Sequence, residues 1–263
     1  MSDICISAVI KAFNEEKNIG ACIDSLVGWA DEIVVVDDAS TDNTVLEAKA
    51  KGARVVPGNR STNAPIDTLD ITGFLAVKGE WILRIDADER MPSGLKDELK
   101  RVASLGDVNG VKFARRNMMF GDWPRHGGWF SPMHLRFFRS DAWDRNWTGQ
   151  IHSNPQVFGS IATLPATSDL STLHLDYDNI PQFVQRTLMN YALAEAKERI
   201  ATGEIVTSVT IIWYPIRKFL GKYFIRQGFR DGFRGLVLAG LLGCYEFLIQ
   251  ANIWDLSRKS GEK

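Results

Sequence analysis

The sequence predicts an α/β fold in which helices flank a mostly parallel β-sheet. Short apolar runs rich in β-branched residues alternate with segments of helical periodicity from the N-terminus onward. This alternation is typical of parallel sheets with right-handed crossovers. The clearest strand, residues 81–85, ends abruptly at the carboxylates Asp86 and Asp88. Ligands of open α/β sheets bind beyond the carboxyl ends of the strands, so these aspartates are candidates for a functional site.

The first part of the chain contains three further strand candidates, each a short apolar run. These predicted strands are residues 4–10, 32–36 and 53–56. Between the first two, apolar residues from Ile19 to Val27 recur at i, i+3, i+4, i+7 and i+8, the pattern of a helix packed on a sheet. Thr41 or Asp42 can cap the next helix, and Gly52 ends it.

Beyond residue 57 the pattern is less regular. A loop rich in Gly, Asn, Ser and Pro comes first, and a region rich in Trp and Gly, residues 120–147, follows later. The other predicted elements are a short helix up to Lys78, a helix from Pro92 to Ser104, strands at 110–116 and 133–139, and a helix at 181–200.

Composition limits the class of protein. The chain has 263 residues, of which 45% are hydrophobic, enough for a proper core. Its three cysteines are far apart and form no Cys-x-x-Cys pair, which indicates a reducing compartment without a disulfide framework or zinc site. No basic, apolar leader precedes the first strand, so we expect no signal peptide and a cytoplasmic location.

The charge is distributed unevenly along the chain. The net charge is −1, yet residues 211–263 carry nine Lys/Arg against four Asp/Glu. An acidic body with a basic tail argues against a general nucleic-acid binder and favours local contact with an anionic surface. The apolar run between Arg234 and Glu246 has 11 residues, whereas a bilayer-spanning helix needs about 20. We therefore expect amphipathic helices that dock on a membrane, or that pack on the core or on a second copy of the chain.

Asp86 and Asp88 suit a hard divalent cation. Mg²⁺ usually takes one or two carboxylates together with substrate phosphates, so two aspartates at a strand end are sufficient. The alternative is an exposed polar turn after a core strand, because Asp-x-Asp also occurs by chance.

Three stretches together point to a family. They are Phe13-Asn14-Glu15-Glu16, Val36-Asp37-Asp38-Ala39-Ser40-Thr41-Asp42 and Asp86-Ala87-Asp88-Glu89. In this order and spacing they resemble the family 2 inverting glycosyltransferases of GT-A fold, above all bacterial enzymes that glycosylate lipopolysaccharide core or related surface glycans. The resemblance continues through Gly127-Gly128-Trp129, residues 135–139, His152, Leu173-His174 and residues 228–235, and so covers most of the chain.

The resemblance implies a nucleotide site in the loops after the first two strands. The residues implicated by position are Lys11, Phe13, Asn14, Glu15, Asp37, Asp38 and Asp86. Phe13 offers a ring on which a base can stack, and Asp37 can accept from a uracil imide N–H, so UDP is the expected nucleotide. The structural alternatives are a core aromatic for Phe13 and a helix-capping residue for Asp37.

The resemblance also implies that Asp88 ligates Mg²⁺ or Mn²⁺, with His174 as a further ligand. Mn²⁺ is the better match to an imidazole nitrogen. The alternative for His174 is a histidine satisfied within a strand. Asp86 would lie near the donor's ribose or sugar.

An inverting transfer needs a general base for the acceptor hydroxyl. His152 is the first candidate, and Asp122, His134 and Glu89 remain open beside it. The sequence departs from the family pattern in two places. Asp70-Ile71 stands where a basic or amide pair is common, and Trp129-Phe130-Ser131-Pro132 lacks an aspartate expected near the acceptor.

The predicted organisation is a catalytic GT-A domain over residues 1–204 and a C-terminal helical extension over residues 205–263. Within the first, residues 1–105 would form the nucleotide-binding half and residues 106–204 the acceptor-side half.

The predicted function is metal-dependent, inverting transfer of a sugar from a nucleotide-sugar donor to a glycan or lipid-linked acceptor in bacterial surface-polysaccharide or lipopolysaccharide synthesis. The predicted location is the inner face of the cell membrane, on an anionic surface, and a homo-oligomer is an open option. The alternative is a catalytically silent scaffold of the same fold. A nucleotidyltransferase is disfavoured because the loop after the first strand, residues 11–16, has no glycine.

Overall fold

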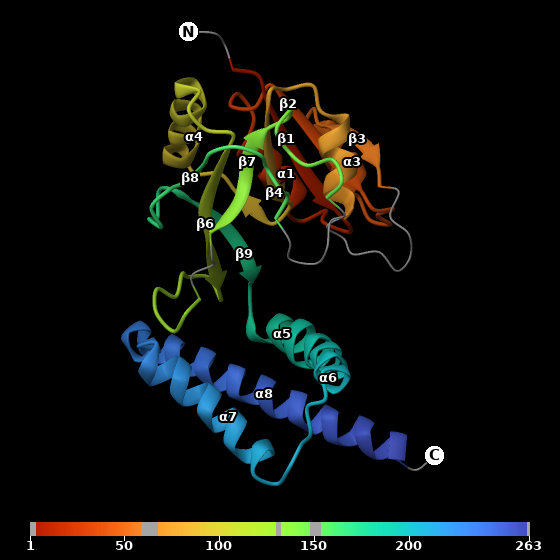
Figure 1. Cartoon of the computed structure of the whole chain (residues 1–263), viewed down its shortest axis with the longest axis vertical. Helices are drawn as coiled ribbons and strands as arrows, with labels where there is room; N and C mark the ends of the chain where they lie inside the picture. Colours follow the sequence, from red (N-terminus) through yellow and green to blue (C-terminus); the bar gives the residue numbers. More distant parts are fainter. Residues whose placement is uncertain (1–3, 59–67, 130–132, 148–153, 262–263) are drawn as a thin grey trace. The chain divides into compact units, whose positions relative to one another are not determined.

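The computed structural model describes residues 4–58, 68–129, 133–147 and 154–261. The chain forms two compact units (Figure 1). Unit 1 comprises Met1–Arg116 and Pro132–His174, and unit 2 comprises Asn117–Ser131 and Leu175–Lys263. Both passages from unit 1 to unit 2 fall within strands, after Arg116 in β6 and after His174 in β9.

Unit 1 is built on the sheet expected from the sequence. The strand order is β3-β2-β1-β4-β7-β6-β9-β5, with β8 beside β6. Strands β3, β2, β1 and β4 pair in parallel, and β7 then pairs antiparallel with both β4 and β6. The α/β class with a mostly parallel sheet is thus confirmed. The strands are β1 (Ile6–Ala12), β2 (Glu32–Asp37), β3 (Arg54–Pro57), β4 (Trp81–Asp86), β5 (Glu89–Arg90), β6 (Gly110–Met119), β7 (His134–Arg139), β8 (Ile161–Thr163) and β9 (Ser171–Tyr177).

Helices bury apolar faces against both sides of this sheet. They are α1 (Ile19–Asp24), α2 (Thr44–Ala50), α3 (Thr68–Ala76) and α4 (Ser93–Leu105). On one side Trp81 stacks on Phe137, with ring centroids 4.7 Å apart, inside a large core cluster. On the other side Phe74 of α3 packs edge-on against Phe138. A Cβ at Gly73 would lie 2.2 Å from Val9 Cγ1, so glycine permits the close approach of α3 to β1.

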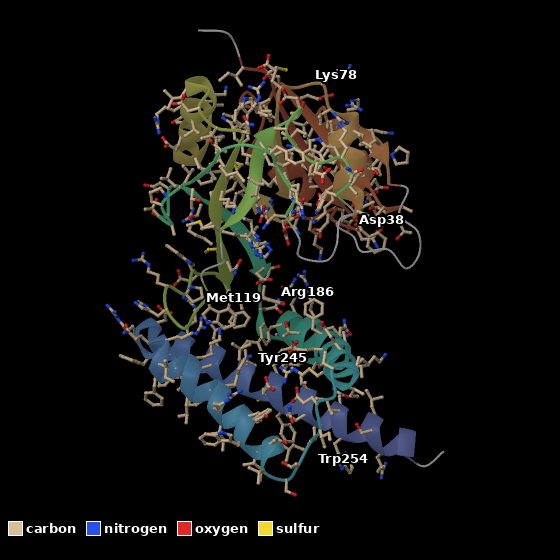
Figure 2. All side chains as sticks on the ribbon, viewed as in Figure 1. Asp38, Lys78, Met119, Arg186, Tyr245 and Trp254 are labelled. Atoms are coloured by element: carbon tan, nitrogen blue, oxygen red, sulfur yellow. The ribbon has the colours of Figure 1, made fainter. Side chains whose placement is uncertain are left out.

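Parallel pairing brings the carboxyl ends of β1, β2 and β4 to one edge of the sheet. Lys11 of β1 is the register partner of Asp86 in β4, and Ala12 is the partner of Asp37 in β2. Figure 2 shows Asp38 at this edge and Lys78 at the opposite end of the strands. The polar residues singled out in the sequence therefore gather where ligands of open α/β sheets bind.

Unit 2 is predominantly helical. Its elements are α5 (Ile180–Phe183), the π-helix η1 (Val184–Tyr191), α6 (Ala192–Ala201), α7 (Thr210–Leu220), the π-helix η2 (Gly221–Ile225), the 3-10 helix η3 (Gly228–Asp231) and α8 (Gly232–Gly261). The predicted helix 181–200 is present as three consecutive segments. Ala192 and Ala196 of α6 are fully buried in a cluster with Ile249 and Ile253 of α8. This packing places residues 175–204 in one unit with the C-terminal helices, whereas the predicted domain boundary lies at 204/205.

Helix α8 differs from the expectation of a short apolar run. A segment of 31 residues, Gly228–Arg258, is long and apolar enough by length and composition to cross a membrane, and 39% of its most apolar window is buried. The apolar run of 11 residues ends at Glu246, whereas the helix continues beyond this residue. The Glu246 carboxylate is buried and accepts a hydrogen bond from Arg199 Nη1 at 2.7 Å. The charge is thus neutralised within the helical unit.

Candidate active site

Asp86, at the carboxyl end of β4, is surrounded by basic side chains from three other strands. Its carboxylate lies 3.3 Å from Lys11 Nζ of β1, 3.2 Å from Arg136 Nη2 of β7 and 3.7 Å from Arg115 Nη1 of β6. Burial opposes the charge on Asp86, but these cations and Arg84 outweigh it and hold the pKa of Asp86 well below its usual range. Asp86 is therefore an ionised, fixed acceptor at neutral pH.

Glu89 occupies the centre of the same cluster. Its side chain is fully buried, and its Oε2 accepts a hydrogen bond from Arg136 Nη1 at 2.6 Å and from the Asp86 backbone N–H at 3.2 Å. Arg115 Nη1 lies 3.5 Å from Glu89 Oε1. Because these contacts enclose the carboxylate, Glu89 is suited to hold Asp86 and Arg136 in place.

Asp70 and Arg84 extend this network beneath the strand ends. Arg84 lies on β4 and contacts Asp70 Oδ2 of α3 through its Nε at 2.7 Å, while Lys11 Nζ lies 3.7 Å from the same oxygen. Both Asp70 and Arg84 are buried. The departure from the family pattern at Asp70 thus supplies a carboxylate that neutralises the buried Arg84 and lies close to Lys11.

The pairing of β5 with β9 brings His174 to the Asp-x-Asp stretch. Glu89 is the register partner of His174, and His174 Nε2 lies 3.2 Å from Asp88 Oδ2. Burial disfavours the imidazolium, but the hydrogen bond and the negative charge of Asp88 outweigh burial and raise the pKa of His174. The two side chains that the resemblance pairs as metal ligands therefore converge in unit 1.

Asp88 and His174 fit a divalent cation that retains open positions. A carboxylate oxygen and an imidazole nitrogen would suit Mn²⁺, whereas Mg²⁺ would rely on the Asp88 carboxylate together with phosphate oxygens and water. Within the described ranges, no group of three or more His, Cys, Asp or Glu side chains could hold a metal ion. Asp86 and Glu89 are paired with arginines, so the other ligands of a bound cation would be phosphate oxygens and water.

The loop after β1 is tied to the loop after β2 by hydrogen bonds. The backbone N–H of Asn14 donates to Ser40 Oγ at 2.9 Å, and Asn14 Oδ1 accepts from the Thr41 N–H at 2.8 Å. The N–H of Glu15 donates to Thr44 Oγ1 at 2.7 Å. Asn14 adopts a left-handed conformation with φ 55° that this cross-linking maintains. The two loops form one ordered rim at the carboxyl edge of the sheet.

Phe13 and Asp37 present groups that a nucleobase can use. The Phe13 side chain is 46% exposed, so it is not a core aromatic. Asp37 Oδ2 accepts from the Ser40 N–H at 3.1 Å, whereas its buried Oδ1 has no hydrogen-bond partner among the described residues. A buried carboxylate oxygen left without a protein donor is suited to accept one from a ligand.

The candidate bases are placed in different parts of the chain. His134, at the start of β7, is neutral at neutral pH because burial and the positive charges of Arg136 and Arg115 lower its pKa to about 4. Asp122 lies in unit 2, where its carboxylate forms an ion pair with Arg234. His152 lies outside the described residues.

The arginines at the centre of the site were not among the predicted site residues. Arg84, Arg115 and Arg136 all lie within strands, and Arg84 and Arg136 interrupt otherwise apolar runs. A charged residue in the middle of a buried strand needs a buried partner. That rule, applied to Arg84 between Leu83 and Ile85, would have indicated the network.

Comparison with known proteins finds one matching family and relatives that align with most of the chain. The model of glycosyl transferase family 2 matches residues 7–158. An uncharacterized glycosyltransferase of Rickettsia typhi is 27% identical over 97% of this chain and 88% of its own length. The lipopolysaccharide core biosynthesis glycosyltransferase LpsC of Rhizobium meliloti is 27% identical over 95% of this chain and 92% of its own length.

The similarity to a solved structure covers a smaller part of the chain. Glucosyl-3-phosphoglycerate synthase of Mycobacterium tuberculosis, in complex with Mn²⁺, UDP and glucosyl-3-phosphoglycerate, shares 31% identity. That match covers 44% of this chain and 45% of the other, with a TM-score of 0.37. Because the family model covers more than half of the chain and contains the β1, β2 and β4 strand ends, the chain belongs to glycosyl transferase family 2 and is a glycosyltransferase.

Proposed function

We propose that this glycosyltransferase uses a UDP-sugar donor and a divalent cation, and that it inverts the configuration at the transferred sugar's anomeric carbon. The observation that carries the proposal is the Asp88–His174 pair at 3.2 Å, beside an Asp86 that cations keep ionised. The donor class follows from family membership, and the solved relative that binds UDP with Mn²⁺ supports the choice of nucleotide and metal.

Asp88 Oδ2 and His174 Nε2 would hold Mg²⁺ or Mn²⁺. When bound, the ion neutralises the charge that develops on the leaving nucleoside diphosphate, a contribution of several kcal/mol. Arg136 and Lys11 fix Asp86 from two sides, at 3.2 and 3.3 Å, so that it can accept hydrogen bonds from the donor's ribose or sugar. This fixed arrangement avoids reorganisation during the reaction.

The nucleotide would bind along the rim formed by the first two loops. Phe13 supplies an exposed ring for the base, and the buried Asp37 Oδ1 supplies an acceptor. Uracil fits this pair, because its imide N–H is a donor and its ring can stack. Asn14, Glu15 and Asp38 belong to the same rim and would line the nucleotide site.

The proposed acceptor is a glycan or lipid-linked saccharide of bacterial surface-polysaccharide or lipopolysaccharide synthesis. The printed name of the Rhizobium meliloti relative supports this class. The acceptor hydroxyl attacks from the face opposite the diphosphate, and a general base accepts its proton. His152 is the base we propose, because Glu89 is enclosed by arginines, Asp122 is paired with Arg234, and a pKa of about 4 makes His134 a weak base.

The decisive experiment is a donor screen with the purified chain. We expect UDP release from one UDP-sugar, loss of that release in EDTA, and recovery on addition of Mn²⁺. Asp88→Asn should lower the rate at least 100-fold without changing the circular dichroism spectrum. Asp141→Asn, an exposed aspartate of the same unit, is the matched control and should retain activity.

Full activity in EDTA, or a wild-type rate for Asp88→Asn, would overturn metal dependence. UDP binding without turnover of any donor, in the presence of acceptor extracts, would instead favour the silent scaffold. Comparison of His152→Ala with His134→Ala then tests the base: only the first should abolish transfer.

A further inference from the structure

The outer face of α7 and η2 is apolar and exposed. Large hydrophobic side chains recur there at i, i+3, i+4, i+7, i+11 and i+15, a spacing that keeps them on one side of a helix. They are Val209, Ile212, Trp213, Ile216, Leu220 and Phe224. Ile212 is 63% exposed and Val209 is 71% exposed. We call this set the α7 stripe. Soluble monomers rarely leave such a continuous row of large apolar side chains in water.

The opposite face of α7 is already covered, so the α7 stripe is not a misplaced core. Helices α7 and α8 lie side by side (Figure 1). A Cβ at Gly243 of α8 would lie 3.4 Å from the Pro215 carbonyl oxygen and 3.6 Å from Phe219 Cβ. Pro215 and Phe219 therefore form the packed face, and the α7 stripe faces away from it.

The charges around the α7 stripe are almost all positive. Between residues 205 and 245 the chain has six Lys/Arg and one acidic residue, Asp231. Asp231 is largely buried and accepts hydrogen bonds from the His126 backbone N–H and side chain at 2.8 and 2.9 Å. Arg217, Arg226 and Arg230 are exposed. Residues 205–245 thus combine exposed apolar side chains with exposed arginines and contain no exposed carboxylate.

We infer that the α7 stripe and its flanking arginines dock unit 2, in the plane of the interface, on an anionic lipid bilayer. Apolar and aromatic side chains would enter the boundary between headgroups and acyl chains, while the arginines contact lipid phosphates. The inference concerns unit 2 alone and depends on neither the sugar nor the metal proposed for unit 1. Docking on the bilayer would bring the enzyme to a lipid-linked acceptor.

Two other occupants fit the surface less well. A second copy of the chain, docked through the same face, would bring the exposed Arg217, Arg226 and Arg230 toward the same arginines of the partner, and such like-charge contacts oppose association. A bilayer-spanning α8 would carry Glu246 and Gln250 into the hydrocarbon. Both are buried against α6 and the following turn instead, where Glu246 accepts from Arg199 and Gln250 Nε2 donates to Glu204 Oε1 at 2.7 Å.

The test is co-sedimentation of the full chain with vesicles of phosphatidylcholine containing one quarter phosphatidylglycerol. We expect binding at low salt that weakens as salt rises, and no binding to pure phosphatidylcholine. Arg217→Glu combined with Arg230→Glu should weaken binding by more than tenfold, because each cation near an anionic leaflet contributes about fivefold, equivalent to about 1 kcal/mol. Ile216→Glu should abolish binding.

The matched controls lie on α2 of unit 1. Lys49→Glu and Leu46→Glu change an exposed cation and a 66%-exposed leucine, and both should leave binding unchanged. All variants should release UDP from the donor at the wild-type rate without vesicles. Failure of docking is thereby separated from failure of the proposed transferase activity.

Three outcomes would overturn the inference. The first is that the wild-type chain stays in the supernatant at low salt. The second is that Ile216→Glu converts a dimer into a monomer in sedimentation velocity, which would show that a second copy covers this face. The third is that bound protein resists alkaline carbonate extraction, which would show that α8 spans the bilayer.

Discussion

Glu89 and His174 stand directly opposite each other in the antiparallel pair of β5 and β9. This register places the His174 imidazole against Asp88, the residue before Glu89, at 3.2 Å. A shift of one residue would turn His174 to the other face of the strand and remove it from the carboxylates. The pairing of a two-residue strand is thus what assembles the candidate metal site.

His174→Ala should weaken Mn²⁺ binding in the presence of UDP by roughly 10- to 100-fold, the range seen when groups that support a metal are removed. The reason is the loss of the only nitrogen donor beside Asp88 within the described part of unit 1. Isothermal titration calorimetry measures the affinity directly. His126→Asn, a histidine of unit 2, serves as control, and an unchanged Mn²⁺ affinity in His174→Ala would exclude His174 as a ligand.

Arg136→Leu should lower the free energy of unfolding by about 3–5 kcal/mol, because it leaves the fully buried Glu89 without its closest cation. Urea denaturation gives the value. Combination with Glu89→Gln should recover part of the loss, since the second change removes the unpaired charge. Arg139→Leu on the same strand breaks only the exposed pair with Asp141 and should cost less than about 1 kcal/mol. Equal losses for Arg136 and Arg139 would contradict this account.

Phe13→Ala should weaken UDP binding by about 1–3 kcal/mol, the contribution of one base stacked on an aromatic ring. Asp37→Asn should reduce the preference for UDP over CMP, because the amide no longer offers the same acceptor to the imide N–H. Calorimetric titrations with UDP, CMP, GDP and dTDP measure both effects. Identical affinities of the wild-type chain for all four nucleotides would refute base recognition by this rim.

The free energy of unfolding should rise between pH 4 and pH 6.5 partly through His134. The folded chain lowers the pKa of His134 from 6.5 to about 4, so over this interval the unfolded chain binds more protons. The contribution is present above pH 6.5 and is lost as pH falls through the folded pKa, for a total of at most about 3 kcal/mol. His134→Gln should flatten this part of the stability curve. A curve with the same slope in the variant would show that other groups are responsible.

The sequence predicted the parallel core of unit 1 because its strands are short, apolar and bounded by turn residues. It also singled out Asp86, Asp88 and His174 as candidate site residues, since their types and order match a family pattern; their roles stay predictions. It did not predict how Arg84, Arg115 and Arg136 neutralise the carboxylates, because those contacts join residues up to 50 positions apart in the chain. Strand pairing, which a single sequence encodes only weakly, creates them.

The packing of the C-terminal helices was harder to predict for another reason. Apolar content alone does not distinguish a helix buried in a protein from one that faces lipid. In α8 the distinction depends on Glu246 and Tyr245, whose partners Arg199 and Glu195 come from α6. Figure 2 shows the labelled Tyr245 side chain between these helices. Glu246 looked like the end of an apolar run because its partner lies 47 residues earlier.

The composition of unit 2 from two separate segments has a consequence for synthesis on the ribosome. Residues 117–129 contain groups whose partners are translated much later. The His126 N–H donates to Asp231, 105 residues on, and Asp122 pairs with Arg234, 112 residues on. At translation rates of about 5–20 residues per second, the tryptophans of this segment wait roughly 5–20 s before their partners emerge. Nascent chains stalled before residue 231 should therefore be the form of this enzyme that most needs chaperones.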